Sequence, residues 1–212
     1  MTWTEIDDTI VVVPVGSCEQ HGPHLPLATD TIVAVALAER LAARRSDCVV
    51  APPLTITASG EHRGFPGTLS IGTEIMAGVV IELVRSADWA AGIVLVNGHG
   101  GNVTAKQRAP EVFDVERRDV LMWWPSMSDA DPHAGHTETS LLLAIDADLV
   151  HLDRATPGPV PTLPELISEG VRPLSPSGVL GDPTTASVGA GERILSTLVD
   201  QLVGAVDGWR PR

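Results

Sequence analysis

Short apolar runs alternate with helix-forming segments along most of the chain. The run Ile10–Val15 (IVVVPV) is continuous and rich in β-branched residues, which is typical of a buried strand. Residues 31–45 follow with apolar side chains at helical spacing. Strand, helix, strand, helix predicts an α/β fold with a mainly parallel central sheet. The predicted strands are Ile10–Val15, Cys48–Ala51, Gly92–Val96 and Asp119–Trp124, and the predicted helices are Thr31–Arg45, Thr73–Ala87, Asn102–Arg118, His136–Ile145 and Gly189–Val206.

Two parts of this pattern are irregular. Pro110 must start, kink or interrupt the predicted helix that contains it. Pro and Gly concentrate in residues 156–190, where we expect a long irregular segment, and such loops are usually functional or disordered. The length of 212 residues suits one domain that spans residues 1–212.

The charge balance argues against two classes of partner. The net charge of −13, from 27 acidic and 14 basic residues, argues against nucleic acid and against an anionic membrane surface. Cys18 and Cys48 allow one bridge at most, and we expect two reduced thiols. The first residues (MTWTEIDDT) lack the basic and apolar regions of a signal peptide, and no apolar run is long enough to span a membrane. We therefore expect a cytoplasmic protein.

Three polar clusters follow predicted strands in the sequence. They are residues 16–30 (GSCEQHGPHLPLATD), residues 97–102 (NGHGGN) and residues 131–140 (DPHAGHTETS). In open α/β sheets, ligands bind beyond the carboxyl ends of the strands. The clusters are therefore the candidate functional site.

The first cluster carries potential metal ligands. Glu19 and His21 are two residues apart in an extended segment, so their side chains leave the same face. A carboxylate and an imidazole that project together can begin a divalent metal site. Asp30 stands where a helix N-cap belongs, and its two oxygens can touch two ions. The alternatives are a plain N-cap for Asp30 and ordinary loop polarity for Glu19 and His21.

The other two clusters complete a candidate dinuclear centre. His99 lies between glycines that let a ligand approach closely, and Glu138 can supply a further carboxylate. Mixed nitrogen and oxygen donors suit zinc, iron(II) or manganese, and a bridging carboxylate suits two ions. Two such ions can share a hydroxide that attacks a carbonyl, while His133 protonates the departing amine. This arrangement indicates hydrolysis of a C–N bond.

Taken together and in this order, the motifs VGSCEQHGPHLPLATDT, NGHGGN and HAGHTETS, with GVLGDPTTAS later in the chain, resemble the creatininase family of metal-dependent amidohydrolases. The resemblance covers about residues 10 to 195. It implies a three-layer α/β sandwich, a homo-oligomer, and two divalent ions bridged by Asp30. The residues that match the family's metal ligands are Glu19, His21, Asp30, His99 and Glu138, and His133 and Glu138 are the expected catalytic residues.

Two positions depart from creatininase itself. It carries a glutamate where this chain has Gly101, so we expect Glu138 to supply the missing donor. It also carries a tryptophan four residues before the catalytic histidine, where this chain has Asp129. Both departures make creatinine a poor candidate substrate.

The segment Ala58–Glu74 looks closest to a family member that trims a C-terminal Val-Tyr dipeptide from a modified precursor peptide. A peptide substrate needs an apolar groove and a cation for its terminal carboxylate. His62 and Arg63 are the candidate carboxylate binders, and Phe65, Trp123 and Trp124 are candidates for the groove. The alternatives are solvated loop charges and core tryptophans. Two other functions stay open: hydrolysis of a small formamide or cyclic amide, and metal binding without catalysis.

Overall fold

The fold is built on a parallel four-stranded sheet, seen here in a computed structural model that describes residues 2–6, 8–128, 130–209 and 211. The strands are β1 (Ile10–Val15), β2 (Cys48–Val50), β3 (Gly92–Asn97) and β4 (Val120–Trp123), in the order β2-β1-β3-β4. Ile10 pairs with Cys48 on one side and with Gly92 on the other. All four predicted strands are confirmed, with small shifts at their ends.

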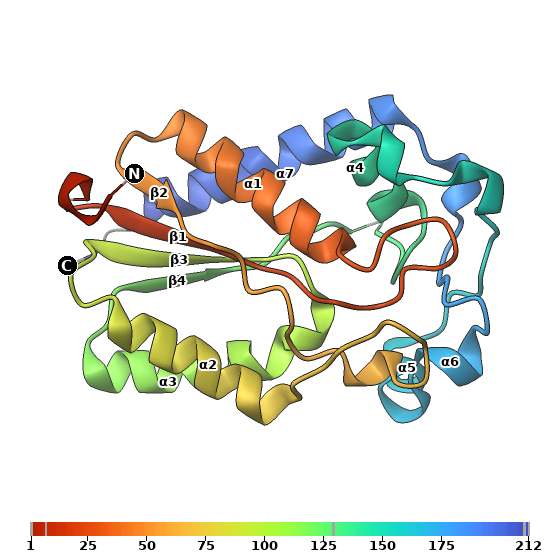
Figure 1. The fold of residues 1–212 in the computed structure, drawn as a ribbon, viewed down its shortest axis with the longest axis horizontal. Helices are drawn as coiled ribbons and strands as arrows, with labels where there is room; N and C mark the ends of the chain where they lie inside the picture. Colours follow the sequence, from red (N-terminus) through yellow and green to blue (C-terminus); the bar gives the residue numbers. More distant parts are fainter. Residues whose placement is uncertain (1, 7, 129, 210, 212) are drawn as a thin grey trace.

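Helices cover both faces of the sheet, which confirms the three-layer prediction (Figure 1). One layer holds α1 (Thr29–Arg44), α4 (His136–Ile145) and α7 (Val188–Gly208), and the other holds α2 (Thr73–Ser86) and α3 (Val103–Glu116). Val12 packs into the first layer, whereas Val11 and Val13 pack into the second. Because successive side chains of a strand point to opposite faces, both faces of β1 must be apolar. This is why β1 is a continuous apolar run in the sequence.

The segment 156–190 is more regular than its composition predicts. It contains the short helices α5 (Leu163–Glu169) and α6 (Val171–Leu174). A capping box starts α5: the Glu165 carboxylate accepts a hydrogen bond from the Thr162 backbone N–H at 2.8 Å, and the Thr162 side chain caps the first turn in return. Both helices pack against the single turn Gly60–His62, so this segment lies close to the functional site.

Three further expectations concern Pro110, the two cysteines and membrane-spanning segments. Pro110 neither starts nor ends a helix but lies inside α3. Cys18 and Cys48 are both free thiols, as predicted. Within the described part of the chain, no helix combines the length and the apolar character needed to cross a bilayer.

Candidate metal centre

The three polar clusters meet beyond the carboxyl ends of β1 and β3. Glu19 and His21 follow β1, His99 follows β3, and Glu138 lies in the first turn of α4. Ligand atoms of Glu19, His21 and Asp30 all lie within 4.8 Å of one another, as do those of His21, His133 and Glu138. The structure therefore brings together side chains that are more than 100 residues apart in the sequence.

Asp30 is not the helix cap that the sequence suggests. The N-cap of α1 is Ala28, and Asp30 lies inside the first turn with 2% of its surface exposed. Its Oδ1 is 3.2 Å from His21 Nε2 and its Oδ2 is 3.0 Å from His99 Nδ1, while the Ser17 hydroxyl donates to Oδ2 at 2.7 Å. Burial would raise the pKa of Asp30, but His21 and His99 hold it well below its usual value. Asp30 is thus a carboxylate placed between two imidazoles.

His21 presents one nitrogen to the carboxylates. Its Nδ1 lies 3.2 Å from the Glu19 backbone carbonyl, which can only accept, so Nδ1 carries the hydrogen. Its Nε2 faces Asp30 and lies 3.7 Å from Glu138 Oε2. Burial lowers the pKa of His21, but these carboxylates overcome it and raise the pKa to about 10. An imidazole oriented by a backbone carbonyl, with its other nitrogen facing carboxylates, is the usual arrangement of a metal-binding histidine.

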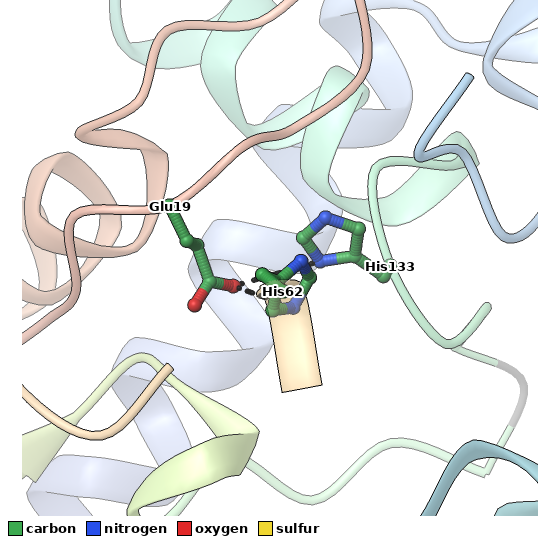
Figure 2. A group of neighbouring side chains, drawn as sticks. All are labelled: Glu19, His62 and His133. Atoms are coloured by element: carbon green, nitrogen blue, oxygen red, sulfur yellow. Dashed lines mark ion pairs between the residues drawn. The ribbon is translucent and has the colours of Figure 1, made fainter. Parts of the chain in front are cut away.

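Glu19 is a buried carboxylate that receives no well-aligned hydrogen bond from the described residues. Only 1% of the residue is exposed, and neither oxygen receives a hydrogen bond. Three imidazoles surround it, with His62 Nε2 at 3.2 Å from Oε1, His99 Nε2 at 3.2 Å from Oε2 and His133 Nδ1 at 3.8 Å from Oε1. Figure 2 shows the carboxylate pointing at the imidazoles of His62 and His133. A buried carboxylate that is surrounded by imidazole nitrogens and receives no well-aligned hydrogen bond is suited to binding a cation.

Gln20 holds the two imidazoles of Figure 2 in place, and sequence reasoning missed it. Its side-chain oxygen accepts from the Gly22 backbone N–H at 2.9 Å, and its amide nitrogen donates to the Gly178 carbonyl at 3.1 Å. These two contacts fix the orientation of the amide. The same nitrogen lies 2.9 Å from His62 Nδ1, which must therefore accept, so the proton of His62 is on Nε2, toward Glu19.

His62 lies in a different environment from the one expected. His62 is a candidate carboxylate binder, with a solvated loop charge as the alternative, and the structure places it inside the cluster with 3% of the residue exposed. Burial lowers the pKa of His62 to about 4, so the ring carries no charge at neutral pH. An uncharged, enclosed imidazole attracts a substrate carboxylate weakly. His62 is enclosed because α5 and α6 cover the loop that carries it.

His133 is fixed by backbone contacts on both sides. Its backbone N–H and carbonyl pair with Leu180, and its Nε2 donates to the Gln20 carbonyl at 2.8 Å. This leaves Nδ1 without its proton and facing Glu19. Burial holds the pKa of His133 well below its usual value. The ring centroid lies 4.2 Å from that of His21, so His133 borders the cluster rather than standing apart from it.

The start of α4 positions Glu138. Asp131 accepts hydrogen bonds from the His136 and Thr137 backbone N–H groups and so caps the helix. The backbone N–H of Ala134, a residue with a φ of 53°, donates to Glu138 Oε2 at 2.5 Å. Burial raises the pKa of Glu138 to about 7. A carboxyl group with this pKa can hold or release a proton near neutral pH.

Glu61 is a further carboxylate that the sequence did not reveal as part of the site. Its Oε1 lies 3.5 Å from His99 Nε2, and ligand atoms of Glu19, Glu61 and His99 all lie within 4.8 Å of one another. The only signal in the sequence was its place next to His62 in the glycine-rich segment.

The other substrate candidates lie nearer the surface. Arg63 is exposed, and Phe65 is half-buried with the Arg172 guanidinium 5.3 Å from its ring centre. Trp124 is half-buried, with Lys106 Nζ 5.0 Å from its ring, whereas Trp123 is a core residue. A cavity of about 180 Å³ adjoins Glu138 and is lined in part by Met127 and Leu141. Asp129, the second departure from creatininase, lies outside the described residues.

Comparisons with known proteins agree with one another. The creatininase family model, described as creatinine amidohydrolase, matches residues 1–206. The mycofactocin precursor peptide peptidase of Mycolicibacterium smegmatis is 49% identical over 213 residues, covering 95% of this chain and 86% of that protein. The creatinine amidohydrolase of Pseudomonas putida is 30% identical, covering 97% of this chain and 94% of that protein. A solved mutant creatininase of the Zn-Zn type superposes with a TM-score of 0.81 at 27% identity, covering 100% of this chain and 97% of the other.

The names of these relatives, a peptidase and an amidohydrolase, both describe cleavage of a C–N bond. The chain is a hydrolase that acts on C–N bonds. It belongs to the creatininase family, as its motifs and its three-layer fold indicate.

Proposed function

We propose that this chain is a dinuclear metal-dependent peptidase that removes a C-terminal Val-Tyr dipeptide from the modified mycofactocin precursor peptide. The observation that carries the metal part is the Glu19 carboxylate, which is buried, surrounded by three imidazoles and without a well-aligned hydrogen bond from the described residues. The substrate part rests on relatives that carry this name at 45–49% identity.

The proposed ligands surround the buried carboxylates. Asp30 directs one oxygen toward His21 and the other toward His99, which suits a carboxylate that bridges two ions. Bound metal ions would polarise the scissile carbonyl and lower the pKa of a water molecule at the site. Zinc and iron(II) are the proposed metals, with manganese as an alternative, because each accepts mixed imidazole and carboxylate donors. The full proposed ligand set is Glu19, His21, Asp30, His99 and Glu138.

Proton transfer falls to His133 and Glu138. With Nε2–H directed at the Gln20 carbonyl, His133 Nδ1 is the atom that can accept a proton and pass it to the departing amine. Glu138, with a pKa of about 7, can exchange a proton from the first turn of α4. His133 is buried, whereas 24% of the Glu138 side chain is exposed to solvent.

The remaining parts of the proposal concern the substrate and the state of the protein. Arg63 is the proposed cation for the terminal carboxylate, and Phe65 and Trp124 are proposed contacts for apolar substrate side chains. We further propose that residues 1–212 form one domain, that the protein works as a homo-oligomer, and that it acts in the cytoplasm. Light scattering and cell fractionation test the last two points.

The test is mass spectrometry of synthetic precursor peptides after incubation with metal-loaded protein. We expect loss of the Val-Tyr tail, no reaction with a peptide that lacks the tail, and no reaction after treatment with a chelator. Intact tails under loaded conditions would refute the proposed substrate. Full activity of the chelated protein would refute the metal mechanism.

A small amide is the second candidate substrate. The partly open cavity of about 180 Å³ beside Glu138 offers space for a small amide, and one relative is a creatinine amidohydrolase. Assays with creatinine and with a formamide, run beside the peptides, separate the two proposals. Faster turnover of either small amide would favour this second function.

A further inference from the structure

Two exposed arginines, Arg63 and Arg172, have no carboxylate partner in the part of the chain that the structure describes. Acidic side chains outnumber basic ones by 27 to 14, so an ion pair is the usual state of an arginine in this protein. The arginines that do pair with a carboxylate are Arg44, Arg45, Arg85, Arg108, Arg118 and Arg154. The charges of Arg63 and Arg172 are therefore available to an anionic ligand.

Arg172 is held against the loop that carries His62. Its guanidinium donates a hydrogen bond to the Gly64 carbonyl and lies 5.3 Å from the centre of the Phe65 ring. Gly64, with a φ of 93°, leaves room for this contact, since a Cβ there would stand 3.0 Å from Arg172 Cδ. A guanidinium has five N–H donors, so the bond to Gly64 leaves others for a ligand. These contacts fix the guanidinium without neutralising its charge.

The place of Arg172 relative to the metal centre fits the length of a dipeptide. His62 lies inside the cluster, with its Nε2 3.2 Å from Glu19 Oε1. Gly64 follows two residues later, and two residues of chain span at most about 7 Å. A C-terminal dipeptide likewise spans about 7 Å from the scissile carbonyl carbon to the terminal carboxylate. A substrate carbonyl at the cluster therefore brings its terminal carboxylate within reach of the guanidinium.

We propose that Arg172 binds the C-terminal carboxylate of the substrate together with Arg63, and so sets a dipeptide as the length of the leaving group. This inference rests on the proposed peptidase function and deepens it. An arginine can bind a carboxylate through two parallel hydrogen bonds, and a guanidinium that is already fixed loses little conformational entropy when it does so. Arg63 adds charge from the same loop but has no comparable side-chain contact among the described residues.

The experiment compares two precursor peptides that differ only at the C-terminus. One ends in the free carboxylate of the Val-Tyr tail and the other in a carboxamide, and mass spectrometry measures kcat/KM for each with the metal-loaded full chain. We expect the wild type to prefer the carboxylate by about 10–100-fold, as a charge-assisted hydrogen bond predicts. Arg172→Gln should lower kcat/KM for the carboxylate peptide by about this factor and change that for the carboxamide by less than about threefold.

Arg44→Gln is the matched control. Arg44 is also exposed, but it ends α1 and lies about 21 Å along the helix from Asp30, so the variant removes the same charge far from the site. It should keep the wild-type preference. Arg172→Met repeats the test with a side chain that can still pack on Phe65 but carries no charge. Arg63→Gln measures the share of the second arginine.

The outcomes separate this inference from the proposed function. A wild type that cleaves neither peptide overturns the proposed function itself. A wild type without a preference for the carboxylate, or an Arg172→Gln variant that keeps the full preference, overturns the role of Arg172 and leaves the proposed peptidase standing. Equal losses with both peptides would make Arg172 a purely structural residue and also overturn the inference. Circular dichroism verifies folding, and Arg172→Met decides if Arg172→Gln does not fold.

Discussion

The helices α4 and α7 pack closely because Gly191 of α7 has no side chain. A Cβ on Gly191 of α7 would overlap with the backbone carbonyl oxygen of Ser140 and stand 2.8 Å from the Ala144 Cβ, both on α4. Gly191→Ala should therefore force the two helices apart. Overpacking lowers the free energy of unfolding by about 1–3 kcal/mol, and we expect a loss near 3 kcal/mol here because the backbone oxygen is rigid. The higher helix propensity of alanine offsets about 1 kcal/mol of this loss. The net loss of about 2 kcal/mol corresponds to a Tm lower by about 4–8 °C in a chain of this size.

Gly204→Ala is the matched control in the same helix. Gly204 is exposed, and a Cβ there would meet no atom within 4 Å. We expect its Tm to rise by about 2–4 °C, since alanine favours the helix by about 1 kcal/mol. Thermal melts followed by circular dichroism, in the presence of a chelator, measure folding without the contribution of bound metal. A Gly191→Ala protein with a Tm equal to or higher than that of the wild type would refute the packing argument, because α4 and α7 would then accommodate the added methyl group without strain.

The remaining predictions concern two histidines. His133→Ala should keep both metal ions and lower turnover by about 10²–10⁴-fold, as loss of a general acid does; turnover within a factor of three of the wild type would remove that role. His24 is fully buried, and burial lowers its pKa to about 4 against 6.5 in the unfolded chain. Because the folded-state pKa is the lower one, this group contributes stability above pH 6.5 that is lost as the pH falls toward 4. The Tm of metal-free wild type should thus drop more between pH 7 and pH 5 than that of His24→Gln, whose amide can keep the bond to Thr139; equal drops would contradict the assignment.

The sheet was predictable because its strands are buried on both faces. A central parallel strand such as β1 cannot alternate polar and apolar residues, so it stands out as an unbroken β-branched run. The helices α5 and α6 were missed for a physical reason as well. Their segment is rich in Pro and Gly, but Thr162 and Glu165 form a capping box that starts a helix despite that composition. The hydrogen bonds of the capping box thus stabilise a helix in a segment whose average helix propensity is low.

The candidate site was predictable only where its residues follow strands. Glu19, His21 and His99 lie directly beyond β1 and β3, and the parallel sheet brings those ends together. His62 and Glu61 come from a loop that no strand carries to the site. His62 is buried and Glu61 is half-buried because α5 and α6, about 100 residues later in the chain, pack over that loop. No local pattern encodes such a contact, so the loop looked solvated in the sequence.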